Sequence, residues 1–136
     1  LAENARARVG ILKEVNPGGR IYVWSDMFDP HHNAHAGYYL VNGDLAGSWE
    51  GLDQGVIVAC WYFERRAESM RFFAERGHPV LIAGYYDGVP GAGVRQIGEW
   101  LGAVPKGAEL RGVMYTTWEN RYGDLEGFAE RAWGTK

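Results

Sequence analysis

The stretch Val56-Ile57-Val58-Ala59-Cys60-Trp61 decides the fold class, because it is an unbroken apolar run rich in β-branched residues. A strand with one face exposed to solvent alternates apolar and polar residues. A strand covered on both faces, as in parallel sheets, is almost continuously apolar. Three further segments share this character, namely Ile21–Trp24, Val80–Tyr86 and Val113–Trp118. The sequence therefore predicts four buried parallel strands.

Apolar residues at helical spacing separate or flank these runs. In Glu64–Arg76, Met70 and Ala74 recur at helical spacing, and Gly77 ends the pattern. Three other helices are marked by Ala5, Val9 and Leu12, by Val94, Ile97 and Leu101, and by Leu125, Phe128 and Ala132 behind the predicted N-cap Asp124. Alternation of strands and helices predicts right-handed crossovers and an α/β fold with a parallel sheet.

Four such units are typical either of a small doubly wound sheet or of half a (β/α)8 barrel. A complete barrel takes about 250 residues, and this chain has 136. The first strand is also not followed by the Gly-rich phosphate turn of a nucleotide-binding doubly wound domain, and both features favour the half-barrel. We expect no cofactor. We expect residues 1–136 to form a single (β/α)4 half-barrel domain. Its two open edges predict closure to eight strands, by homodimerisation or by a missing N-terminal half.

The segment Phe28–Gly55 interrupts the alternation, and loops of this length usually have a function. We expect a long functional loop with a short strand or helical turn. His31, His32 and His35 lie in it and are candidate metal ligands, since imidazole nitrogens bind Zn²⁺ or Ni²⁺. No Glu stands in an H-E-x-x-H arrangement. We therefore favour a loop over the strand ends, with one His bonded to a carboxylate or substrate, and no metal.

Composition and charge exclude several classes of partner. The formal net charge is −3 and basic clusters are absent, which argues against nucleic acid. No apolar run approaches the roughly 20 residues that cross a membrane. A single cysteine, Cys60, excludes an internal disulfide framework.

Each predicted strand ends in a large aromatic residue beside a carboxylate. The pairs are Trp24 with Asp26, Trp61 with Glu64, Tyr85 and Tyr86 with Asp87, and Trp118 with Glu119. The binding site of a parallel α/β sheet forms beyond the carboxyl ends of its strands. Sugars offer C–H faces that stack on aromatic rings, and hydroxyl groups that donate to carboxylates. This pattern predicts a saccharide ligand, although any one of these aromatic residues can instead fill the barrel core.

Three segments resemble the C-terminal part of the catalytic barrel of glycoside hydrolase family 20, the β-N-acetylhexosaminidases. They are Val23–Met27, Gly84–Asp87 and Tyr115–Glu119, and the resemblance covers about residues 15–133. It implies that Tyr85 bonds the acetamido oxygen of the substrate and Asp87 a sugar hydroxyl. It also implies that Trp24, Trp61 and Trp118 wall the sugar pocket. The family's Trp-x-Glu differs here, because Trp118 and Glu119 are adjacent.

A second departure concerns catalysis. The family's adjacent Asp-Glu pair, in which Glu is the general acid, follows the fourth strand of the barrel and has no equivalent in this sequence. We therefore expect a carbohydrate-site half that is catalytically silent or very weak alone, with Trp24, Asp26, Trp61, Tyr85, Asp87, Trp118 and Glu119 lining the site. Two alternatives stay open. One is a glycosidase active as a closed homodimer, with Asp26 and Asp87 as acid or nucleophile candidates; the other is a non-enzymatic folding or assembly module.

Overall fold

Four short parallel strands form one sheet in the computed structural model, which describes residues 1–38, 42–84 and 86–134. The elements run in the order α1 (Ala2–Val15), β1 (Tyr22–Trp24), η1 (Asp26–Phe28), η2 (Ser48–Gly51), β2 (Ile57–Cys60), η3 (Phe63–Arg65), α2 (Arg66–Ala74), β3 (Val80–Ile82), α3 (Ala92–Gly102), β4 (Leu110–Val113) and α4 (Leu125–Trp133). The strands lie in the order β1-β2-β3-β4, and every neighbouring pair is parallel. The prediction of an α/β fold with a parallel sheet is confirmed, and the arrangement is consistent with half of an α/β barrel.

The boundaries of the last two strands were predicted wrongly. β3 ends at Ile82 rather than Tyr86, and β4 covers Leu110–Val113 rather than Val113–Trp118. Apolar content alone missed the start of β4, because Arg111 and Gly112 interrupt the run; Gly112 has φ +143°, a value that glycine adopts readily. The pairing of β3 with β4 is irregular at Arg111, where the register shifts between Val80 and Leu81. Beyond Val113, the Thr116 hydroxyl donates to the Gly84 carbonyl.

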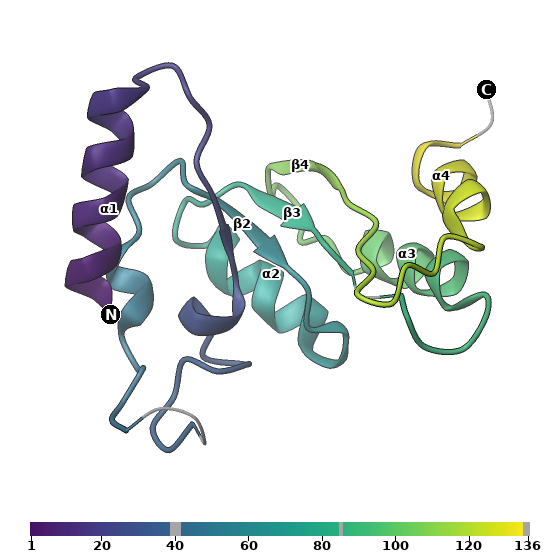
Figure 1. Cartoon of the computed structure of the whole chain (residues 1–136), viewed down its shortest axis with the longest axis horizontal. Coiled ribbons are helices and arrows are strands. Elements are labelled where there is room, and N and C mark those ends of the chain that lie inside the picture. The colour runs from purple at the N-terminus through teal and green to yellow at the C-terminus, as the bar shows by residue number, and fades with distance from the viewer. Residues whose placement is uncertain (39–41, 85, 135–136) are drawn as a thin grey trace.

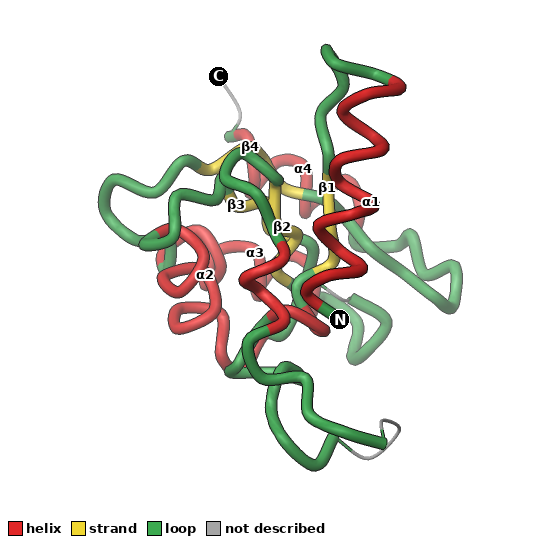
Figure 2. The backbone as a smooth tube through the Cα atoms, turned by 90° about the vertical axis from the view of Figure 1, so that its left-hand side faces the viewer, coloured by secondary structure: helices red, strands yellow, loops and turns green. Residues whose placement is uncertain are grey.

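One face of the sheet packs against helices and forms the core. Val58, Cys60, Val80 and Ile82 point to this face and are almost fully buried. The helices contribute the large core side chains Met70, Phe73, Ile97, Trp100 and Phe128. Figure 2 shows α2 and α3 on one side of the strands. Side chains alternate along a strand, so the residues between these positions face away from the core.

The opposite face has no helical cover comparable to that of the core. Tyr22 and Trp24, on the outer strand β1, are each 49% exposed. Helix α1 stands beside the β1 edge in both views (Figures 1 and 2) and packs mainly on η2. Gly51 permits this approach, because a Cβ there would collide with the Ala2 backbone. Among the described residues, no helix has the length and apolar character that a membrane span requires.

The segment between β1 and β2 is a long loop, as predicted, with residues 39–41 outside the described part. It contains the two short 3-10 helices η1 and η2 and an isolated antiparallel bridge between Ala36 and Asp44. This agrees with the expectation of a short strand or helical turn within Phe28–Gly55.

Asp124 precedes α4, as predicted for an N-cap, but its side chain makes no capping hydrogen bond to that helix. Its carboxylate instead accepts hydrogen bonds from the backbone N–H groups of Gly91 (3.0 Å) and Gly93 (3.1 Å). These donors open α3, so Asp124 caps the neighbouring helix and ties α4 to it.

Candidate functional site

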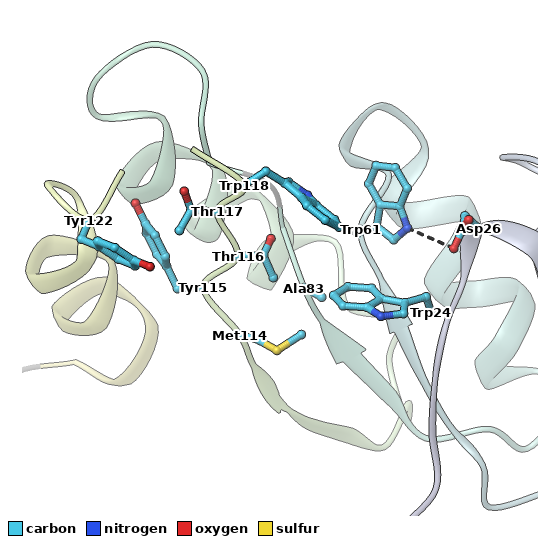
Figure 3. Close-up of a pocket in the computed structure, with 10 residues that line it drawn as sticks. All are labelled: Trp24, Asp26, Trp61, Ala83, Met114, Tyr115, Thr116, Thr117, Trp118 and Tyr122. Atoms are coloured by element: carbon cyan, nitrogen blue, oxygen red, sulfur yellow. Dashed lines mark hydrogen bonds between the residues drawn. The ribbon is translucent and has the colours of Figure 1, made fainter. Parts of the chain in front are cut away.

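A cavity of ≈ 550 Å³ lies at the carboxyl ends of the strands, on the face away from the helical core. We refer to it as the aromatic cavity. It is lined by Trp24, Asp26, Trp61, Ala83, Met114, Tyr115, Thr116, Thr117, Trp118 and Tyr122. Figure 3 shows the rings of Trp24, Trp61 and Trp118 close to one another, with Tyr115 and Tyr122 farther along the same cavity.

The strand register explains why distant residues meet here. Trp24 pairs with Ala59, Ala59 with Leu81, and Leu81 with Gly112. Side chains two residues apart along a strand lie on the same face of the sheet. Trp61, Ala83 and Met114 follow Ala59, Leu81 and Gly112 by two residues, and all three line the aromatic cavity together with Trp24.

Four of the seven predicted site residues line this cavity, namely Trp24, Asp26, Trp61 and Trp118. Trp24 is the last residue of β1, Trp61 follows β2 directly, and Trp118 lies in the loop after β4. Trp118 is 83% exposed, so nearly the whole indole is accessible to a ligand.

Asp26 is the one charged side chain among the described residues that line the cavity. It opens η1 directly after β1. One carboxylate oxygen lies 3.5 Å from the Trp61 indole nitrogen. This long hydrogen bond links Asp26 to Trp61 at one end of the cavity. Within the described part of the chain, no group donates a hydrogen bond to the other oxygen, and Asp26 is partly exposed.

Asp87 has a different role in the structure. The residue is 4% exposed, and its carboxylate accepts hydrogen bonds from the Thr117 hydroxyl and from the backbone N–H groups of Trp118 and Glu119, the last at 3.1 Å. Asp87 is not among the residues lining the cavity. Its hydrogen bonds hold the loop that carries Trp118, so Asp87 positions that indole without lining the cavity itself.

The hydrogen bonds also change the acidity of Asp87. Burial alone would raise its pKa, but the donors Thr117, Trp118 and Glu119 favour the carboxylate and outweigh burial. The pKa of Asp87 is therefore lowered from its ordinary value.

Glu119 and Tyr85 complete the predicted set. The Glu119 carboxylate forms an exposed ion pair with Arg121 at 2.8 Å, and the residue does not line the cavity. The sequence-based placement of Asp87 and Glu119 in the lining therefore differs from the structure. Tyr85 lies outside the described residues.

The three histidines of the long loop do not converge on a metal site. In the described part of the chain, no group of three or more His, Cys, Asp or Glu side chains is arranged to hold a metal ion. His35 contacts the Ala36 carbonyl, and the His31 ring lies against Phe72. His32 lies between two aromatic rings, stacked on Tyr62 at 4.3 Å and edge-on to Trp61 at 4.6 Å.

His32 therefore supports Trp61 from the side of the loop. Burial lowers the pKa of its imidazole, against the opposing attraction of Asp26 and Asp29.

Strand-end reasoning missed several lining residues. Tyr115 and Met114 lie just beyond the true end of β4, which was placed too late in the chain. Tyr122 lies farther along the same loop, where no strand or motif marks it. The Tyr115 hydroxyl donates to the Arg121 carbonyl at 2.8 Å, which fixes the ring in the cavity wall.

Comparison with known proteins identifies no relative. No family model matches the chain, and no curated protein or solved structure matches it significantly.

The role of Asp87 is tested by Asp87→Asn. The lowered pKa means that the folded state binds fewer protons than the unfolded state around the ordinary pKa of about 3.9. The stabilisation is therefore complete above that value and is lost as the pH falls through the lowered pKa. We expect Asp87→Asn to reduce the free energy of unfolding at neutral pH, with a difference from wild type that shrinks in acid.

Urea unfolding followed by far-UV circular dichroism at a series of pH values measures this difference. The matched control is Asp53→Asn, which removes an exposed pair with Lys13 (2.7 Å) and should have little effect. Equal destabilisation of the Asp87 variant at neutral and acid pH would contradict the assignment.

Proposed function

We propose that the chain binds a saccharide in the aromatic cavity and forms one half of a (β/α)8 barrel. The observation that carries the proposal is the meeting of Trp24, Trp61 and Trp118, from three separate strand ends, around one cavity that also contains a carboxylate. Indole rings stack on the apolar C–H faces of sugar rings, and the cavity volume of ≈ 550 Å³ lies within the usual range of ligand sites.

The polar groups of the cavity favour few, specific contacts with a sugar. The hydroxyls of Thr116 and Thr117 already donate to Gly84 and Asp87. These hydroxyls therefore have no proton left for a ligand, and the Asp26 oxygen that has no donor among the described residues is the charged acceptor for a sugar hydroxyl. Stacking therefore supplies most of the contact area, and Asp26 orients the ring.

The resemblance to glycoside hydrolase family 20 supports a sugar ligand only through the tryptophans. The family role of Asp87, bonding to a sugar hydroxyl, conflicts with the three donors that already surround this carboxylate. We assign Asp87 a positioning role instead. The family role of Tyr85 as a ligand of the acetamido oxygen is implied by the resemblance alone, and the saccharide proposal does not depend on it.

We further propose that the single chain does not hydrolyse glycosides. Hydrolysis generally uses two carboxyl groups, about 5–10 Å apart, flanking the scissile bond. Asp26 is the one carboxylate among the described lining residues. A homodimer that brought a second Asp26 to the cavity would supply the missing group, and this is the alternative function.

The half-barrel proposal rests on the uneven cover of the sheet. Parallel sheets are normally covered on both faces, whereas here β1 and β4 are the outer strands of the sheet, and Tyr22 and Trp24 on β1 are half exposed on the face away from the core helices. In the proposed dimer, β1 of one chain pairs in parallel with β4 of the other. Closure around one two-fold axis then gives eight parallel strands. The second alternative function, a non-enzymatic assembly module, corresponds to the same proposed dimer without a bound ligand.

The closure proposal predicts a dimer. Multi-angle light scattering should give twice the mass of one chain. A well-behaved monomer would rule out closure by a second copy, and polydisperse aggregation would indicate that the natural partner is a missing N-terminal half.

The saccharide proposal predicts that Trp61→Ala weakens binding of a chitin-type trimer of N-acetylglucosamine by about tenfold or more, because a stacking ring is lost. Isothermal titration calorimetry measures the affinity. The matched control is Trp133→Ala, which removes a tryptophan that is 66% exposed on α4 and outside the cavity. Equal losses in both variants would refute the proposal, as would a wild type that binds neither this trimer nor the corresponding glucosamine trimer.

The catalytic proposal predicts no turnover of an aryl N-acetylglucosaminide above the buffer background, since a second free carboxylate is missing from the described lining. Release of the aryl group is followed by absorbance. Turnover that disappears in Asp26→Asn would instead support the glycosidase alternative.

A further inference from the structure

The aromatic cavity is lined by several aromatic rings and, among its described residues, by one charged side chain, the carboxylate of Asp26. Its described lining includes Trp24, Trp61, Trp118, Tyr115 and Tyr122, and the one ionisable acid Asp26. No lysine, arginine or histidine is among these residues. Figure 3 shows the rings on both sides of the cavity and Asp26 at the Trp61 end.

Such a lining attracts positive charge. The face of an aromatic ring carries partial negative charge, and indole binds a cation more strongly than phenol or benzene does. A carboxylate adds a full negative charge at one side. A neutral saccharide uses the rings for stacking alone, whereas a saccharide with an ammonium group also gains the electrostatic attraction.

The nearest basic groups do not offset this field. Arg121, in the same loop as Trp118, pairs with Glu119 at 2.8 Å and contacts the Gly88 carbonyl at 3.2 Å. His32 lies beside Trp61 between ring faces, and its burial favours the neutral imidazole. The charge on the Asp26 carboxylate is therefore balanced by no cation among the described lining residues.

We propose that the aromatic cavity selects saccharides that carry a protonated amine, such as glucosamine units, over neutral or acidic ones. Asp26 contacts the ammonium group and the tryptophan faces enclose it. This inference rests on the proposed saccharide function and defines the class of sugar.

Two trisaccharides with the same sugar backbone, which differ only in N-acetylation, test the preference for a protonated amine. They are a chitosan-type trimer of glucosamine and a chitin-type trimer of N-acetylglucosamine, compared by calorimetry at a pH where the amine is protonated. We expect the glucosamine trimer to bind about tenfold more tightly at low ionic strength. The preference should shrink in high salt, because screening weakens the attraction.

The variant Asp26→Asn keeps the side-chain shape and removes the charge. We expect it to reduce the ratio of the two affinities by severalfold. Asp53→Asn, which removes the same charge from an exposed position outside the cavity, should leave the ratio unchanged. The salt dependence of the wild type provides a second measurement that needs no variant.

The outcomes separate this inference from the saccharide function. Equal binding of both trimers, or tighter binding of the acetylated one, overturns the selectivity and leaves the saccharide proposal intact. If neither trimer binds, the saccharide proposal fails. Tetramethylammonium is then the remaining probe: binding that weakens in Asp26→Asn supports cation selection by the cavity, and no binding overturns it.

Discussion

The parallel backbone ladder is the constraint on which the rest of the structure depends. It brings the carboxyl ends of all four strands to one edge, and its register decides which face each side chain takes. A shift of one residue in the pairing of a strand moves its side chains to the opposite face. Trp61 would then enter the helical core, and the small Cys60 would take its place in the cavity. The site is therefore a consequence of the register.

The sequence was sufficient for the order and type of the elements because the strongest signals were local. The run through Val58 and Cys60 is continuously apolar and forms a fully buried strand, and Met70 and Phe73 lie on the buried face of α2. The same criterion failed for β4, where Arg111 and Gly112 occupy strand positions because Leu110 and Val113 provide enough packing on either side. Apolar content located the other outer strand, β1, within one residue, so the failure at β4 comes from its own Arg111 and Gly112.

Prediction of the site failed where contacts between distant residues decide the role of a carboxylate. Asp26 and Asp87 look alike in sequence, since each follows a strand and stands near aromatic residues. The backbone N–H groups that surround Asp87 come from residues more than thirty positions away, and no local pattern announces them. Glu119 differs, because its partner Arg121 is only two positions away in the same exposed loop, and Glu119 does not line the cavity. The tryptophans were easier to place, because an indole beside a strand end has few other positions.

The two parts of the proposed function meet at the same strands. β1 and β4 are the outer strands of the sheet, and both lead to the aromatic cavity, since Trp24 ends β1 and Trp118 lies in the loop after β4. In the closure that we propose, β1 of one chain joins β4 of the other, and the Trp24 of each chain would face the loop after β4 of its neighbour. The exposed indole of Trp118 would then belong to a rim shared by two chains. Ligand binding and assembly would be coupled in that arrangement, since both would depend on how the loop after β4 is held, and Asp87 holds this loop.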